Sequence, residues 1–591
     1  MPFSRRRFPA VFRGGRPRPL SGVGRVLSPR GALAVHQVDG AFLFALRAAL
    51  AMALVALPIV LAGRPDLAVY AMLGSFTTTF GRNLPYPRRA RVLALVGVAM
   101  TACVGCGAAL AAPAQPRAGG AGAVAVVPAT ALVAGLAKFA CDAARLGGLG
   151  AVLLLFSFAV AANSSTALAD VLPRTGLAAA ASAVAWGLAL VGRLVHPDRP
   201  QRLAVAAALR ALAELLDSVG AGKATGRKRH RATVAVLNAY HSLGLTPPAD
   251  VRCTGPEGAC ARLTDMSWCL LIGSARPSRD DVPVTPERLR QQALLLADRR
   301  RRVTPLLPEL ASRPAAAARG GARPVTGQAA PEAGPAVQRA SELMLGPRHR
   351  GPGHISARVV PALRMTLGTG VAGGLALLLG LGHGYWAAIS AAAVLHSVNI
   401  RTTAQRAAQR TLGTVVGLLI ALGVLAAHPD PTTLALVIVL LEFLLEYAVV
   451  RNYGLGVVFV TPLALLLSDM AVPVPAGELV HDRGLASFLG IAVGLICALL
   501  VVDDHAAVRV ESALAACTRA AEHAERALAG PCGPPPPDIQ VRLAEAVVEL
   551  READDAAAGE LWPAGIDPAE LAAAEQRGYR LLERLLHHRR E

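Results

Sequence analysis

The stretch of the chain that decides its fold is residues 384–425, which have the sequence GYWAAISAAAVLHSVNIRTTAQRAAQRTLGTVVGLLIALGVL. It consists of two apolar runs with three arginines, Arg401, Arg406 and Arg410, between them. A mainly apolar run of about 17–25 residues is long enough to cross the hydrocarbon core of a bilayer as one helix. Such runs, separated by short arginine-bearing segments, recur along most of the chain. The sequence therefore predicts a polytopic membrane protein.

The chain is both strongly hydrophobic and strongly basic, and the positions of the basic residues explain this combination. Of 591 residues, 53% are hydrophobic, yet 60 Lys+Arg against 40 Asp+Glu give a net charge of +20. A strongly basic chain is often a nucleic-acid binder. Here aromatic residues make up only 4%, which leaves little material for stacking on bases, and the arginines gather between the apolar runs. We expect the lipid bilayer as a partner, and no nucleic acid.

We predict an all-α polytopic membrane protein made of a duplicated six-helix unit (6+6 transmembrane helices) with helical cytoplasmic segments. The expected spans are 41–61, 66–80, 92–112, 121–141, 147–168 and 175–195 in the first half, and 359–381, 384–398, 411–427, 432–450, 454–470 and 484–502 in the second. The second helix of each half is short for a span, so we expect it to tilt, break or share its depth with a loop.

The basic residues of the short loops predict the orientation, because cytoplasmic loops are enriched in Lys and Arg. Loops with several arginines alternate with loops that have few or none. The basic loops carry Arg82, Arg88, Arg89, Arg91, Arg145, Arg401, Arg406, Arg410 and Arg451. We therefore expect a multi-pass protein of the inner (plasma) membrane with both termini in the cytoplasm.

The rest of the chain divides into three segments by composition. Residues 1–40 form a basic tail that we expect to be disordered, since Arg5-Arg6-Arg7 is not followed by the apolar core of a twin-arginine signal. Residues 196–355 separate the membrane repeats 41–195 and 356–502, and combine helical periodicity with an Ala/Pro/Gly-rich linker at 312–335.

The C-terminal segment, 503–591, differs in sign from the rest of the chain. It has 17 Asp+Glu against 10 Arg, a net charge of −7, and helical periodicity on both sides of the break PCGPPPP. We expect a cytoplasmic helical hairpin that docks on the basic middle segment. The docking partner is the same chain or a second subunit, which leaves a homodimer open.

The two halves resemble each other residue by residue. Arg47 matches Arg364 in the first helix of each half, and Tyr70 matches the region of Tyr385 in the second. Further along, Arg91 matches Arg410, Arg145 matches Arg451, and Arg174 matches Arg483. The offset drifts by only about a dozen residues over six elements, which indicates a duplication. Because each half has an even number of helices, the copies would be related by an axis along the membrane normal.

These residues support a resemblance to a known family. Residues 384–425, then RNYGLGVVFVTPLALLLSD (451–469) and the last helix led by Arg483, resemble the membrane domain of the fusaric acid resistance (FUSC) family. That family is similar to bacterial aromatic acid exporters and to plant aluminium-activated malate transporters. The resemblance is strongest over 355–505 and implies an inner-membrane protein that moves organic anions. The first half departs from the pattern at Tyr70-Ala71 and Phe156-Ser157, where the second half has Tyr385-Trp386 and Thr461-Pro462.

An anion transporter needs fixed positive charge where the anion passes, and arginine near the membrane is costly unless it is used or paired. Arg47 and Arg364 are candidates for substrate binding at matched positions in their helices; snorkelling to the interface would explain them equally well. Arg406 and Arg410 lie four residues apart on one helical face and could line a vestibule that attracts anions. The alternative for both is a plain topology determinant.

Other candidates come from polar and acidic groups in the second half. Tyr385, Trp386 and Asn399 offer stacking and hydrogen-bonding groups, although anchoring at the interface explains the aromatic residues as well. Thr461, before Pro462, lies where the proline should free backbone carbonyls for a ligand.

Two acidic residues are candidates for proton coupling. Glu442 and Glu446 lie four residues apart, on one face of an apolar helix. A pair of Glu446 with Arg451 is the structural alternative.

Motifs for other chemistry are missing. Residues 368–373 fit GxGxxG but lie in an apolar run without a preceding strand, and no P-loop is present, so we expect no nucleotide. Cys103 and Cys106 form a CxxC without a second ligand pair, which favours packing over a metal site. We expect no cofactor, no metal and no enzyme activity.

Three functions remain open. The first is secondary export of small organic anions, with aromatic carboxylic acids as the expected class. The second is channel-like conduction of such anions. The third is a non-transporting membrane scaffold in cell-envelope assembly.

Overall fold

The computed structural model of the chain describes residues 40–311 and 353–588, except 83, 145, 147–149, 165, 223–224, 246–255, 274–284, 301–305, 398, 472–474, 501–504, 531–536 and 559–565. The predicted tail (1–40) and flexible linker (312–335) therefore lie almost wholly outside the described residues. Every regular element in the described part is a helix. The predicted all-α class is confirmed.

Nine of the described helices are long and apolar enough to cross a membrane. They are α2 (Ala41–Leu61), α4 (Tyr86–Ala114), α5 (Gly120–Ala143), α7 (Leu168–Val195), α14 (Gly353–Leu378), α16 (Ile400–Ala426), α17 (Pro431–Val449), α18 (Tyr453–Ala471) and α19 (Ala476–Leu500). Their outward faces carry exposed leucines such as Leu95, Leu172 and Leu378, as expected for side chains that contact lipid. The chain is thus a multi-pass membrane protein in contact with the bilayer.

Three further helices occupy predicted spans but are shorter: α3 (Pro65–Ser75), α6 (Gly150–Ala162) and α15 (Tyr385–Leu395). Helices α3 and α15 have 11 residues each, so the predicted shortness of the second helix in each half is confirmed. A short 3-10 helix, η1 (Phe76–Thr79), continues α3, and another, η2 (Pro116–Ala118), follows α4.

Helix α6 corrects the prediction of a helix over 147–168. It ends at Ala162 because polar side chains then bind the last helical carbonyls: Asn163 Nδ2 donates to Ala159 O (2.9 Å) and Ser164 Oγ donates to Ala161 O (2.7 Å). The helix thus stops where the sequence changes from apolar residues to Asn-Ser-Ser-Thr at 163–166.

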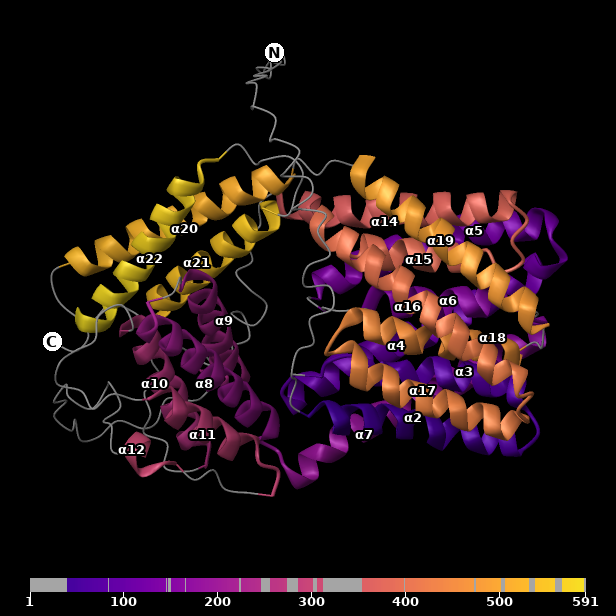
Figure 1. The fold of residues 1–591 in the computed structure, drawn as a ribbon, viewed down its shortest axis with the longest axis horizontal. Coiled ribbons are helices and arrows are strands. Elements are labelled where there is room, and N and C mark those ends of the chain that lie inside the picture. The colour runs from indigo at the N-terminus through magenta and orange to yellow at the C-terminus, as the bar shows by residue number, and fades with distance from the viewer. Residues whose placement is uncertain are drawn as a thin grey trace, which may run out of the picture.

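The membrane helices form one body with a continuous apolar core that draws on both halves of the chain. Two extensive helix–helix contacts join the halves, one between α5 and α14 and the other between α2 and α17. In Figure 1 the membrane helices lie together on the right. The helices outside the candidate spans are grouped beyond their left-hand end.

The short helices α3 and α15 lie inside this body. All residues of α15 from Trp386 to Leu395 are buried, as are those of α3 from Ala68 to Ser75. Helix α15 packs on α14 and α19 of its own half and touches α6 of the other half, whereas α3 packs on α2 and α7 and touches α18. An 11-residue helix is only about 16 Å long, so each of these helices spans only about half of a hydrocarbon core that is about 30 Å thick.

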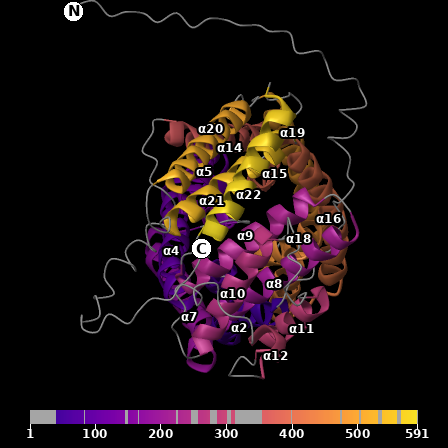
Figure 2. The same cartoon turned by 90° about the vertical axis from the view of Figure 1, so that its left-hand side faces the viewer.

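The helices outside the candidate spans form a second unit, which we call the peripheral bundle. It consists of α8 (Arg199–Gly220), α9 (Gly226–Leu243), α10 (Pro256–Gly273), α11 (Pro286–Ala297), α12 (Pro308–Ala311), α20 (His505–Ala529), α21 (Pro537–Ala557) and α22 (Pro568–His588). Figure 2 views the molecule from the side of this bundle. We call the end of the membrane helices that faces the bundle the bundle side.

The middle and C-terminal segments share one apolar core in this bundle. Trp268 Nε1 donates to Gln540 Oε1 (3.4 Å), and the hydroxyls of Thr233 and Tyr579 lie 3.1 Å apart. The expected docking of the C-terminal segment on the middle segment is therefore present within one chain. The expected hairpin was incomplete, because α20 adds a third helix ahead of the proline-rich break.

A buried pair in the bundle makes its stability depend on pH. Tyr240 Oη donates to Asp265 Oδ1 (2.5 Å), and burial, with the Asp265 charge, raises the pKa of Tyr240 well above its ordinary value. Because the folded state holds this proton more tightly, the contribution to stability is complete below about pH 10 and is lost as the pH rises further.

We therefore expect Tyr240→Phe to lower the stability of the bundle at pH 8 by about 1–3 kcal/mol and to make its loss of stability above pH 10 shallower. Denaturant unfolding, followed by tryptophan fluorescence at pH 8 to 11, measures both effects, since Trp268 lies 6.1 Å from the Tyr240 ring. The control Tyr447→Phe, in α17, should leave the bundle unchanged. A Tyr240→Phe profile parallel to that of the wild type would contradict the assignment.

Candidate anion site around helix α15

Glycines on α19 let α15 approach closely enough to place its side chains. A Cβ atom added at Gly490 would overlap the carbonyl of Ala387 and lie 2.8 Å from Ser390 Cβ, and one at Gly494 would lie 3.2 Å from the Ala391 carbonyl. Small residues are common where membrane helices touch. This contact sets the first two turns of α15 against the middle of α19.

In that contact the guanidinium of Arg483 (α19) lies over the ring of Trp386 (α15), with its Cζ atom 3.4 Å from the ring centroid. Both residues are almost fully buried, at 2% and 1% exposure. Arg483 makes no ion pair within the described part of the chain, and its Nε and Nη1 atoms are buried there without a hydrogen-bond partner. A buried cation without a counter-charge is costly, so Arg483 is the strongest sign of a site.

Further hydrogen-bond donors near Arg483 are also unused. Within the described residues, Trp386 Nε1, Ser487 Oγ and Arg410 Nε are buried without partners. Ser487 lies one helical turn beyond Arg483, on the same face of α19. The helices around Arg483 therefore offer several donors that have no partner among the described residues.

Aromatic rings continue from this site into the first half. The rings of Trp386 and Phe156 are 5.7 Å apart, and Phe156 is 5.9 Å from Phe76 in η1. On the other side Tyr385 lies 4.8 Å from Trp386 and its hydroxyl is 3.4 Å from Ser468 Oγ. Both predicted aromatic candidates, Tyr385 and Trp386, thus belong to one row that crosses the boundary between the halves.

Arg410 reaches the same short helix from α16. Its Nη2 donates to Ser390 Oγ (3.2 Å) and its Nη1 to Tyr453 Oη (3.3 Å). The charges of Arg410 and Arg483 act on each other, so two like charges share the region around α15. Arg406, one turn earlier, stacks over Tyr453 at 5.4 Å. Of the predicted cations, Arg410 is the one that the structure brings to this site.

Three other predicted residues are engaged in contacts with the protein itself. Arg364 Nη2 donates to the carbonyl of Ser397 (3.2 Å). Asn399 caps α16, where its Oδ1 accepts from Thr402 N (2.9 Å), and its Nδ2 donates to Ala556 O (3.2 Å) in the peripheral bundle. Thr461 packs against Gly417. Their roles in substrate binding stay predictions.

A second cluster of charge lies between α2 and α17, around the predicted proton-coupling residues. Glu442 is 1% exposed, and neither of its carboxyl oxygens has a hydrogen-bond partner in the described chain. The charges of Arg82 and Arg47 act on Glu446. Both arginines stack on Phe44, at 4.7 and 4.9 Å.

The structure therefore places Arg47 with the acidic pair and not at the aromatic row. The charges that act on Glu446 are those of Arg82 and Arg47, and not that of Arg451, the residue of the structural alternative. Arg451 donates to the Tyr447 carbonyl (2.7 Å) and stacks over the Tyr447 ring at 3.7 Å.

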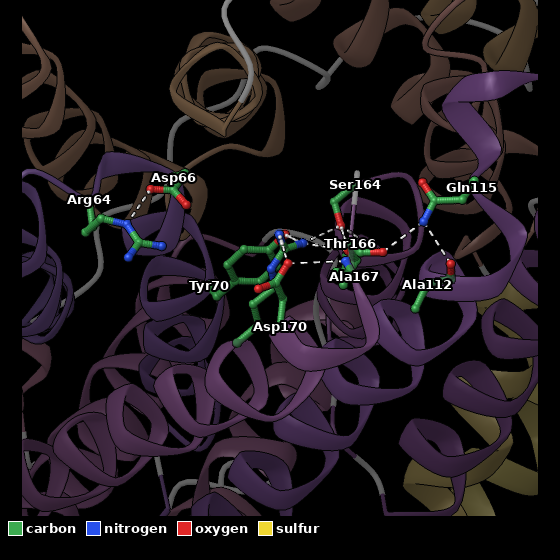
Figure 3. Close-up of polar contacts among 11 residues, drawn as sticks. Arg64, Asp66, Tyr70, Ala112, Gln115, Ser164, Thr166, Ala167 and Asp170 are labelled. Carbon is green, nitrogen blue, oxygen red and sulfur yellow. Dashed lines mark hydrogen bonds and ion pairs between the residues drawn. The ribbon is translucent and has the colours of Figure 1, made fainter.

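The first half contains a related cation in a different setting. Arg174 (α7) stacks over Tyr70 (α3) at 4.9 Å, and its Nη1 donates to the Tyr70 hydroxyl at 2.7 Å. Thr166, Ser164 and Asp170 complete its surroundings. Figure 3 shows Tyr70, Ser164, Thr166 and Asp170 gathered in one place.

The sequence did not identify Arg483 as a site residue. It entered only as the match of Arg174 and as the residue that leads the predicted last helix. Its position was the feature of the sequence that could have identified it as a site residue. Arg483 lies seven residues after Ala476, where α19 begins, and outside the basic loops. Among the described residues no group of His, Cys, Asp and Glu could hold a metal ion.

The fold and the site define a multi-pass helical membrane protein with a buried, unneutralised arginine beside a row of aromatic rings. Residues 371–497 match the model of the family described as fusaric acid resistance protein-like, a range that contains α15 and Arg483. Over this region the chain is similar to the fusaric acid resistance-like family of membrane proteins.

One relative was found among curated proteins. The uncharacterized membrane protein YvaC of Bacillus subtilis (strain 168) is 32% identical over 224 residues, which is 36% of this chain. The match covers only about a third of the length of that relative (34%). No solved structure matches the chain.

The glycine contact yields a direct test of how the site is held. We expect Gly490→Ala to push α15 away from α19, because the new Cβ would overlap the Ala387 carbonyl, and to lower the thermal stability of the purified protein. The matched control is Gly374→Ala in α14, where a Cβ meets nothing within 4 Å. Thermal unfolding in detergent compares them; equal melting temperatures for the two variants would contradict the proposed contact.

Proposed function

We propose that the protein is a secondary transporter that exports small organic anions, with aromatic carboxylic acids as the substrate class, and that it is not an enzyme. The observation that carries this proposal is Arg483, a buried guanidinium without an ion pair in the described chain, held against Trp386. The match to the fusaric acid resistance-like family supports a transport function of this general kind.

The chemistry of the site fits the two parts of such a substrate. A guanidinium that stacks one face on an indole keeps its N–H edge free for a carboxylate, which it binds in a fixed fork geometry. The row from Phe156 through Trp386 to Tyr385 offers ring faces and edges for an aromatic group. A bound carboxylate would supply the negative charge that the protein itself leaves out.

We further propose that the membrane part is the predicted duplicated six-helix unit. The packing supports this: α5 of the first half packs on α14, the first helix of the second half, and α17 packs on α2 in the same way. Likewise α6 touches α15, and α18 touches α3. Exchanging the halves leaves these contacts in place, as expected for two copies related by an axis between them.

Proton coupling is assigned to Glu442 and Glu446. A carboxylate is expensive to bury without partners, and Glu442 has no hydrogen-bond partner in the described chain. Arg47 and Arg82 supply opposite charge to Glu446 alone. The pair could then hold a proton in one state of the transporter and release it in another, and no nucleotide would be needed.

The bundle side is assigned to the cytoplasm of an inner-membrane protein. The chain passes from α7 into α8 and from α19 into α20 at this side. The basic loops that follow α3, α15 and α17 precede helices that start at the same side, in agreement with the enrichment of arginine in cytoplasmic loops.

We expect Arg483→Gln to reduce transport of aromatic acids by roughly 10–100-fold, since a charge-assisted hydrogen bond contributes about 1.5–3 kcal/mol. Uptake of radiolabelled benzoate into proteoliposomes measures this, with tolerance of the acid in a deletion strain as the cellular counterpart. Arg401→Gln, an exposed arginine of α16, is the matched control.

The same measurement separates the proposed function from its alternatives. Equal transport by both variants would contradict the anion site, and no transport by the wild type would favour a scaffold. A benzoate current that ignores the proton gradient would favour a channel.

We expect Glu442→Gln to abolish the dependence of benzoate transport on an imposed pH gradient, while exchange of labelled for unlabelled benzoate without a gradient continues. The amide keeps the size of the side chain but cannot carry a proton. Glu478→Gln, exposed near the start of α19, should behave like the wild type. Unchanged coupling in Glu442→Gln would remove this residue from the mechanism.

A further inference from the structure

The arginines of the two halves share one arrangement but differ in their neighbours. Each lies early in the last helix of its half and stacks on an aromatic side chain of the short helix: Arg174 on Tyr70 and Arg483 on Trp386. Around Arg174 the protein supplies partners for both Nη atoms. Its Nη1 donates to Thr166 Oγ1 (2.6 Å), to Tyr70 Oη (2.7 Å) and to Ser164 Oγ (3.1 Å).

A carboxylate completes the surroundings of Arg174. Asp170 Oδ2 lies 3.5 Å from Arg174 Nη2, one turn earlier on the same helix. The same oxygen accepts from the backbone N–H of Ala167 (3.2 Å), which fixes the carboxylate at the start of α7. The Asp170 side chain is 49% exposed, so the charge is held where the helix meets its surroundings.

In the second half the positions of these partners are taken by residues whose side chains have no hydrogen-bond acceptor. Arg483 follows Arg174 by 309 positions (483 − 174), and the same offset places Leu479 at Asp170. Leu479 is buried, one turn before Arg483 on the same helical face. At this offset Ser164 and Thr166 correspond in sequence to Pro473 and Pro475, which have no hydroxyl. The short helix still supplies an aromatic partner, now from the next position along it (Trp386), and the carboxylate and hydroxyls are lost.

We propose that Asp170 is a built-in substitute for the transported carboxylate, so that each chain has one open anion site, at Arg483, and one closed copy, at Arg174. This inference rests on the proposed function and on the proposed duplication. The residue at the position of Asp170 and Leu479 determines whether a copy is open. A substrate would then place its carboxylate on Arg483 from the side where Leu479 leaves the guanidinium without a partner.

The test exchanges the two residues in the full-length protein in lipid nanodiscs. Thermal unfolding is measured without ligand, with benzoate, and with benzamide as the uncharged analogue of similar size. We expect Leu479→Asp to neutralise Arg483 and to abolish the stabilisation by benzoate, whereas Leu479→Asn should keep it. We expect Asp170→Leu to lower the melting temperature and to gain a larger benzoate effect than the wild type, with no response to benzamide.

A double-mutant cycle guards against a general cost of placing an acid inside the protein. If Asp at 479 pairs with Arg483, then Arg483→Gln lowers the melting temperature more in the Leu479→Asp protein than in the wild type. Additive effects in this cycle would overturn the inference, as would a benzoate response in Asp170→Leu no larger than that of the wild type.

The two proposals fail in different ways. A wild type that neither binds benzoate nor transports it would contradict the proposed substrate class. The unfolding of the ligand-free variants and the cycle would still decide whether Asp170 acts as the internal counter-charge of Arg174 and whether position 479 can do the same for Arg483.

Discussion

A guanidinium inside a membrane protein has to be hydrated, paired with an acid or held against the face of an aromatic ring. Among the described residues Arg483 makes no ion pair and has the third arrangement, which constrains much of the second half. Trp386 must be delivered to the guanidinium by a helix that starts at depth, so α15 is short. Helix α15 must also come close to α19, which requires Gly490 and Gly494 at the contact.

The first half meets the same constraint in a different way. Arg174 also stacks on an aromatic side chain of a short helix, but hydroxyls and a carboxylate surround it. Each short helix is therefore held by an arginine: Arg174 has protein partners at both Nη atoms, whereas Nε and Nη1 of Arg483 have none among the described residues. This asymmetry, and not the number of arginines, distinguishes a structural copy from one that could bind an anion.

Much of the fold could be predicted from the sequence, because the length of an apolar run sets whether a helix can cross a bilayer. The short second helices followed from the same reasoning. The ion pair of Lys138 with Asp142, at 2.7 Å, joins residues four apart, which share a helical face. The early end of α6 could not be predicted, since it depends on which way the side chains of Asn163 and Ser164 turn.

The site was harder to predict than the fold for a physical reason. The contact of Arg483 with Trp386 joins residues far apart in the chain, and its meaning depends on the absence of a carboxylate in three dimensions. Sequence spacing identifies residues that share a helix face, such as Glu442 and Glu446. It does not indicate that Arg47 approaches Glu446 from another helix, or that Arg410 reaches Ser390 on α15.

The two ends of α15 are tied to different parts of the protein, and this constrains how the site can move. At its start, Trp386 carries Arg483 and Tyr385 lies beside Ser468. Just beyond its end, the carbonyl of Ser397 accepts from Arg364, and Asn399 donates to Ala556 in the peripheral bundle.

Because α15 is one continuous helix of 11 residues, we expect a shift of the bundle that pulls on Asn399 to act through this helix on the stack of Trp386 on Arg483. Conversely, an anion that drew the guanidinium of Arg483 away from the indole of Trp386 would remove a contact at the other end of the same helix. We therefore expect the peripheral bundle and the proposed anion site to be coupled through α15, whichever of them moves first.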